Sequence, residues 1–158
     1  MPGALTLYTR EAQFVLVTIP VHIIMAYIPY AIRQIAILMM RKGFDNANPR
    51  LYIASLENEA LSGNPAPLFA LRAHGCHLNS IENLGFWIPA VLAALLYSTV
   101  PYLALVVAAI HLGLRFFYML FYLFNSNKIV SYFRSLIWFF AWCCPLIVLW
   151  ECVYQLRP

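Results

Sequence analysis

The amino-acid sequence predicts an all-α integral membrane protein, an up-and-down four-helix bundle forming one domain over residues 1–158. Hydrophobic residues make up 63% of the chain and charged residues 10%, whereas a soluble domain is about half apolar and about a quarter charged. Four segments are also apolar over the length of about 20 residues that crosses a bilayer. Short connections between the last three segments favour antiparallel neighbours, as in a bundle.

The first spanning helix is expected over residues 14–40. Residues 14–32 carry no charge, and the apolar pattern continues until the sequence RKGF. Pro20 and Pro29 fall inside this segment, where membrane helices tolerate proline. The first helix is therefore predicted to cross the bilayer despite its two prolines.

A loop is expected over residues 45–67, because Asn-Pro, Ser-Gly and Pro-x-Pro sequences interrupt it. Residues 54–61 are predicted to form at most a short surface helix within this loop. The other spanning helices are expected over 67–97, 101–124 and 131–154, separated by turns at STVPY and NSNK.

The positions of the basic residues predict the orientation of the bundle. Lys and Arg side chains near membrane spans prefer the cytoplasmic side. Six of these residues lie on the side of the first and third connections: Arg41, Lys42, Arg50, Arg72, Lys128 and Arg134. Two lie on the other side, Arg10 and Arg157. Arg33 and Arg115 are not counted because they fall inside spans. Both termini are therefore predicted on the outer or lumenal side. This flanking pattern also accounts for the net charge of +4, so no nucleic-acid partner is expected.

Two spans carry polar stripes. Successive helical residues turn by about 100°, so the polar residues of each span share one face: Arg72, Asn79 and Glu82 on the second, and His111, Arg115, Tyr118 and Tyr122 on the third. Ionisable groups inside a membrane normally face protein or a water-filled cavity. One interpretation is that Glu82 pairs with Arg115 and holds the bundle together, whether or not a ligand also binds. The other is that the cations and hydroxyls bind a small anion. The histidines lack the spacing of a metal site, so no metal is expected.

These stripes lie in motifs that resemble the MAPEG family, the membrane-associated proteins of eicosanoid and glutathione metabolism. ALRAHGCHLNSIENLGFWIPAVLAALL is similar to the second helix of that family, with Arg followed by Asn-x-x-Glu. LRFFYMLFYLF and FRSLIW resemble its third helix and the start of its fourth, and RKGFDNANPR resembles the end of its first. The resemblance covers residues 41–142.

The resemblance implies a homotrimer that binds glutathione between protomers, near the cytosolic face. The residues at matching positions would contact the tripeptide or stabilise its thiolate: Arg41, Arg72, Asn79, Glu82, Tyr118 and Tyr122 for binding, Arg134 and Ser135 for the thiolate. A guanidinium beside the sulfur raises the fraction of thiolate, which is the nucleophile. A lipophilic electrophile would then arrive from the bilayer.

Two positions depart from the catalytic members of the family and favour a bacterial-type or divergent member. Gly75 stands where catalytic members often carry a second Arg, and Gly85 stands where they usually carry Pro. Two hypotheses follow. The chain is a glutathione transferase or peroxidase acting on lipophilic substrates, or it is a non-catalytic subunit that assembles with itself or with other membrane subunits.

We expect cysteines introduced by Gly3→Cys and Leu156→Cys to react with a membrane-impermeant maleimide from the same side of sealed vesicles. The four native cysteines are replaced by alanine beforehand. Lys128→Cys serves as the control and should react from the opposite side. Opposite accessibility of positions 3 and 156 would show that the number of spans is odd.

Overall fold

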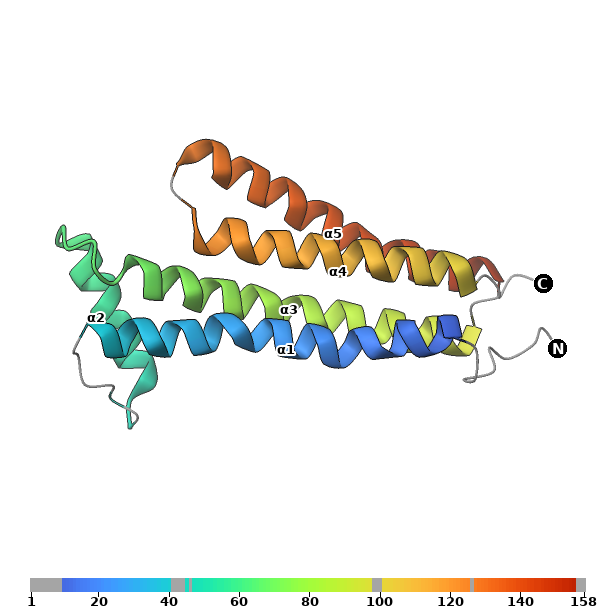
Figure 1. Ribbon diagram of the computed structural model, residues 1–158, viewed down its shortest axis with the longest axis horizontal. Helices are drawn as coiled ribbons and strands as arrows, with labels where there is room; N and C mark the ends of the chain where they lie inside the picture. The colour runs from blue at the N-terminus through green and yellow to red at the C-terminus, as the bar shows by residue number, and fades with distance from the viewer. Residues whose placement is uncertain (1–9, 41–44, 46, 98–100, 126, 156–158) are drawn as a thin grey trace.

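The computed structural model describes residues 10–40, 45, 47–97, 101–125 and 127–155. This part of the chain is helical and contains no strand (Figure 1). The helices are α1 (Arg10–Met39), α2 (Pro49–Leu61), α3 (Leu68–Tyr97), α4 (Pro101–Leu123) and α5 (Lys128–Gln155). All except α2 are long and apolar enough to cross a membrane. The predicted all-α membrane fold with four spans is confirmed.

Two spanning helices begin earlier than predicted. α1 starts at Arg10, four residues before the apolar run, and Glu11 in its first turn interacts favourably with the helix dipole. α5 starts at Lys128 because Asn127 caps it: the Val130 N–H donates to Asn127 Oδ1 over 3.0 Å. The turn predicted at Ser98–Val100 lies outside the described residues.

α2 is longer than the surface helix predicted at residues 54–61. Pro49 occupies its first turn, where a missing N–H costs nothing. Before it, the Asp45 carboxylate accepts hydrogen bonds from the Asn48 side chain and from the backbone N–H groups of Asn48 and Ala47. These hydrogen bonds lower the pKa of the Asp45 carboxyl, and the bond from the Asn48 side chain has the largest effect. A turn that begins at Asp45 thus leads directly into the helix.

α2 is followed by a glycine in the left-handed conformation, and its single buried side chain attaches it to the bundle. Gly63 adopts a φ of 100°, the left-handed conformation that commonly ends a helix at glycine. Leu56 is buried and packs in a cluster with Ile37 of α1 and Ala70 of α3. α2 therefore lies across the end of the bundle where α1 ends and α3 begins (Figure 1).

The four long helices run antiparallel to their chain neighbours. α1 packs mainly against α3, and α4 packs mainly against α5. α1 begins and α5 ends at the same end of the bundle, and the first turns of α5 diverge from α3 at the end that carries α2 (Figure 1). The divergence leaves room for side chains of α3, α4 and α5 to line a pocket.

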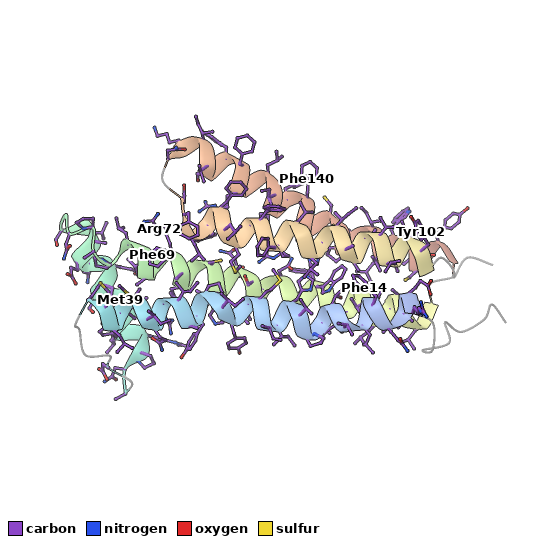
Figure 2. The ribbon with its side chains drawn as sticks, in the orientation of Figure 1. Phe14, Met39, Phe69, Arg72, Tyr102 and Phe140 are labelled. Atoms are coloured by element: carbon purple, nitrogen blue, oxygen red, sulfur yellow. The ribbon has the colours of Figure 1, made fainter. Side chains whose placement is uncertain are left out.

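Small residues allow the long helices to approach closely. Ala90, Ala94, Ala108 and Ala141 are all fully or almost fully buried. Large apolar side chains such as Phe14 and Phe140 lie on the outside of the bundle instead (Figure 2). This distribution suits a bilayer, where association depends on close packing because lipid tails are as apolar as the side chains.

Candidate functional site

Two arginines and two tyrosines stack in a row between α3, α4 and α5. The Arg115 guanidinium carbon lies 4.4 Å from the centroid of the Tyr118 ring, and the Arg134 carbon lies 4.6 Å from that of Tyr122. The two rings meet edge to face with centroids 5.5 Å apart. We call these four residues the Arg–Tyr ladder. Each end is a cation–π contact, which is strongest where water is excluded.

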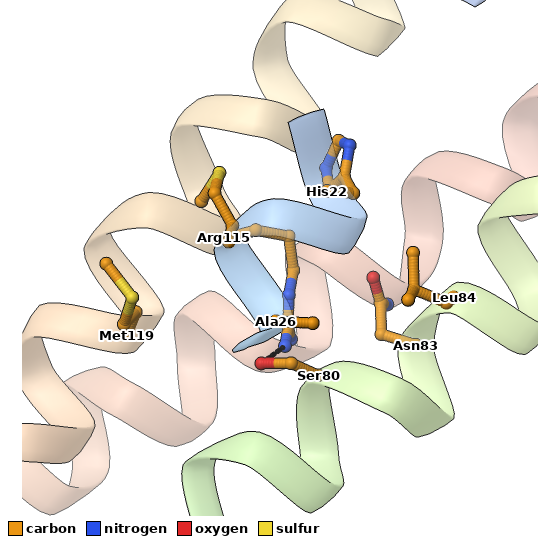
Figure 3. A pocket seen from close by; sticks show the side chains of 8 residues that line it. His22, Ala26, Ser80, Asn83, Leu84, Arg115 and Met119 are labelled. Carbon is orange, nitrogen blue, oxygen red and sulfur yellow. Dashed lines mark hydrogen bonds between the residues drawn. The ribbon is translucent and has the colours of Figure 1, made fainter. Parts of the chain in front are cut away.

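Arg115, the inner end of the ladder, is held by neutral groups of α3. Its Nη2 donates to Ser80 Oγ over 3.0 Å and to the Asn79 carbonyl over 3.4 Å. Figure 3 shows the bond to Ser80 at the wall of a small cavity of about 10 Å³. That volume is about what one water molecule needs, so this cavity is no site for an organic ligand.

The ion pair between Glu82 and Arg115 is not formed. Glu82 is exposed on α3 and has no ion-pair partner in the part of the chain that the structure describes. Arg115 is only 4% exposed, and its guanidinium donates a hydrogen bond to Ser80 of α3 instead. The sequence pattern places both residues on the right helices, but the rotation of α3 carries Glu82 to the surface.

A second, larger pocket of about 190 Å³ opens beside the outer end of the ladder, and we call it the α3–α4–α5 pocket. Its lining combines one guanidinium with hydroxyl, amide and indole groups: Asn79, Tyr118, Tyr122, Arg134, Ser135 and Trp138. Five of these six residues were predicted as site residues. The sixth is Trp138, which was not among the predicted site residues.

Arg134 and Ser135, the predicted catalytic pair, both donate hydrogen bonds to Ser131, one turn earlier on α5. Arg134 Nη2 donates to Ser131 Oγ over 3.3 Å, and Ser135 Oγ donates to the Ser131 carbonyl over 3.1 Å. Arg134 uses one of its five N–H groups in this way. The guanidinium, half-buried against Tyr122, therefore retains donors for a ligand in the pocket.

Gly75 is the reason that Tyr122 can lie where it does. A Cβ placed on Gly75 would be 2.5 Å from the Tyr122 hydroxyl oxygen and 3.2 Å from its Cζ. Carbon atoms rarely approach an oxygen that closely, so any side chain here displaces the ring. The absence of a side chain at position 75 thus makes room for the tyrosine of the ladder.

The remaining predicted site residues do not line the α3–α4–α5 pocket. Arg72 is half-buried near the α2 end of the bundle, where its Nη1 donates to the Asn125 carbonyl and its Nε to the Leu68 carbonyl over 3.3 Å (Figure 2). Glu82 is exposed, and Arg41 lies outside the described residues. Asn79 lines the pocket, with its amide donating to the Gly75 carbonyl over 2.9 Å.

A polar core deeper in the bundle includes a residue that the sequence pattern did not single out, His22. The Trp87 indole stacks on His111 with centroids 4.0 Å apart, and His111 stacks on His22 at 4.6 Å. The Trp87 Nε1–H donates to Thr18 Oγ1 over 3.1 Å. His22 and Thr18 are four residues apart on α1 and share a buried face. That spacing is the sequence feature from which this polar core could have been predicted.

The histidines of α3 connect it to α1. His74 Nδ1 accepts a hydrogen bond of 2.9 Å from Arg33 Nη1, and His77 Nδ1 donates to the Ala26 carbonyl over 2.8 Å. Each histidine thus has its own partner on α1. In the described ranges, no group of three or more His, Cys, Asp or Glu side chains is placed to hold a metal.

A family model for MAPEG matches residues 12–154, which cover almost the full length of the four spans and all residues that line the α3–α4–α5 pocket. The chain belongs to the MAPEG family. Searches among curated proteins and among solved structures found no match. The sequence motifs that resembled this family are thus part of a match over most of the chain.

Within this MAPEG chain, the motif residues divide into two groups. Asn79, Tyr118, Tyr122, Arg134 and Ser135 line one pocket, whereas Arg72, Glu82 and Arg115 do not line it. A ligand that contacted both groups would extend beyond the pocket of one chain.

Gly75→Ala tests the contact between Gly75 and Tyr122. Alanine is about 1 kcal/mol more favourable than glycine inside a helix, but here its methyl group displaces Tyr122 and breaks the stack with Arg134. We expect Gly75→Ala to lower the free energy of unfolding in mixed micelles. In a Tyr122→Phe background, which lacks the closest atom, the same change should be less unfavourable by about 0.5 kcal/mol or more.

Gly85→Ala is the matched control on the same helix, because a Cβ there meets no atom within 4 Å. It should raise stability by up to about 1 kcal/mol. Equal effects at Gly75 and Gly85 would mean that Tyr122 does not pack on Gly75.

Proposed function

We propose that this MAPEG chain forms a homotrimer, binds glutathione in the α3–α4–α5 pocket and conjugates or reduces lipophilic electrophiles. The observation that carries the proposal is the position of Arg134. This cation stacks on Tyr122 and lines a polar pocket together with Ser135 and Asn79. Guanidinium and hydroxyl groups are the partners that a small anionic ligand requires.

The size of the pocket supports completion by a neighbouring protomer. Its volume is about 190 Å³, below the roughly 300–1,000 Å³ of typical ligand pockets. Glutathione has two carboxylates, whereas the pocket lining has one guanidinium. Arg72 and Arg41 are candidates for the second carboxylate, and the exposed Glu82 is a candidate for the ammonium group.

Arg134 would act on the thiol of bound glutathione. An unperturbed thiol has a pKa of about 8.5, so only a few per cent is ionised near pH 7. A guanidinium beside the sulfur lowers that pKa and raises the thiolate fraction. The thiolate then forms a bond to an electrophilic carbon, and the leaving group departs with the electron pair of the bond that breaks. Ser135 would position the sulfur.

An apolar hollow on α5 supports a lipophilic second substrate. Ile129, Tyr132, Phe133 and Leu136 line a hollow of about 310 Å³ on the same helix as Arg134. Side chains of this kind contact lipid in a membrane. A lipophilic electrophile would therefore reach Arg134 along α5 without passing through water.

A second candidate function is a non-catalytic membrane subunit that assembles with itself or with other membrane subunits. The observation that favours it is the contact between Gly75 and Tyr122. This contact leaves no space at position 75 for another cation, and Arg72 already donates to Asn125. The exposed aromatic residues of α5, such as Phe139 and Phe140, would then pack against other subunits.

Arg134→Ala should abolish conjugation of glutathione to a lipophilic aryl halide, because the thiolate loses its counter-charge. Lys128→Ala is the control: it removes an exposed cation at the start of the same helix and should leave the rate unchanged. The rate is measured on the protein in nanodiscs, and calorimetry at millimolar glutathione measures binding. A well-folded oligomer that binds no glutathione would favour the structural subunit.

A further inference from the structure

A pocket between α1, α2 and α3 shares no lining residue with the α3–α4–α5 pocket. Its volume is about 320 Å³, within the range of ligand-binding pockets. Charged and polar side chains line it together with proline and small apolar residues: Arg33, Pro49, Arg50, Ile53, Ala54, Glu57 and His74. We call it the α2 pocket, because α2 contributes five of these seven residues.

Arg33 is a buried cation with unused hydrogen-bonding capacity. It is only 7% exposed, stacks on Tyr30 at 4.5 Å and donates to His74 Nδ1 over 2.9 Å. Its Nε has no hydrogen-bond partner, and no carboxylate pairs with it, among the residues that the structure describes. A buried charge is costly unless it is paired. An anion in the α2 pocket would supply the missing partner.

α2 brings one more cation and one anion to the same pocket. Arg50, Ile53, Ala54 and Glu57 follow the spacing that places residues on one face of a helix. Arg50 and Glu57 are both exposed at the pocket, about 10 Å apart along the helix axis. His74 accepts a bond from Arg33 at Nδ1, so its neutral ring is a donor at Nε2. The pocket thus combines two guanidinium groups with one carboxylate.

This combination suits a ligand with a phosphate beside an ammonium group. Guanidinium groups bind phosphate oxygens with paired hydrogen bonds, whereas a carboxylate would repel a simple anion. A primary ammonium offers three N–H donors to Glu57, and a quaternary ammonium offers none. Five residues of α2 line the pocket, and Figure 1 shows α2 across the end of the bundle where α1 ends and α3 begins. The ends of membrane-spanning helices lie near the headgroup layer.

We propose that the α2 pocket binds a phosphoethanolamine group. Arg33 and Arg50 hold the phosphate, and Glu57 accepts hydrogen bonds from the ammonium. The group comes either from phosphatidylethanolamine in the surrounding membrane or from a soluble phosphoethanolamine ester. Binding there neutralises Arg33 and connects α2 to α1 and α3.

Native mass spectrometry of the delipidated full-length protein tests this proposal. The protein is titrated with short-chain phosphatidylethanolamine and with phosphatidylcholine of the same chain length. We expect stronger binding of the ethanolamine lipid. Arg50→Gln should weaken that binding about tenfold, the equivalent of one charged hydrogen bond. Glu57→Gln should remove the preference for ethanolamine over choline.

Lys128→Gln is the control, because it removes one exposed cation from the same end of the bundle without touching the α2 pocket. It should leave both affinities unchanged. Competition by soluble phosphoethanolamine would assign the site to the headgroup alone, and lack of competition would assign it to the membrane lipid. Equal losses in Arg50→Gln and Lys128→Gln, or an unchanged headgroup preference in Glu57→Gln, would overturn the proposal.

Discussion

The guanidinium of Arg115 is the constraint on which the rest of the structure depends. A permanent charge in a membrane span needs partners inside the protein, and Arg115 finds them in neutral groups. Ser80 and the Asn79 carbonyl accept its hydrogen bonds, and the Tyr118 ring faces its cation. These contacts set the rotation of α3 against α4. With α3 rotated in this way, Asn79 reaches the pocket and Glu82 remains on the outer surface.

The Arg–Tyr ladder carries this arrangement from the core to α5. Tyr118 contacts Tyr122, and Tyr122 contacts Arg134, so a cation in the core and a cation at the pocket are connected by two rings. Gly75 is essential to this connection because any side chain there would displace Tyr122. Gly75 thus leaves the space in which Tyr122 contacts Arg134. In the proposed glutathione site, a glycine at this position offers no side chain to a carboxylate.

Much of the fold and part of the site were predictable from sequence. Apolar length identified the four spans, and helical spacing placed Tyr118 and Tyr122 on one face. Spacing alone does not say which neighbour that face meets, so the pairing of Arg115 with Ser80 in place of Glu82 was missed. Arg33 was only left out of the count of flanking charges, and nothing in the sequence indicated its partner, His74, which is 41 residues away. The early start of α5 depends on a cap at Asn127, which hydrophobicity does not reveal.

The most direct test of the proposed thiol site is a structure of the assembly in nanodiscs, determined by electron microscopy with millimolar glutathione. The account predicts three copies of the chain and ligand density that begins in the α3–α4–α5 pocket, with sulfur beside Arg134. It also predicts that the density extends toward Glu82 and the neighbouring protomer. A well-resolved assembly with Arg134 facing lipid, or with density elsewhere and none beside Arg134, would contradict it.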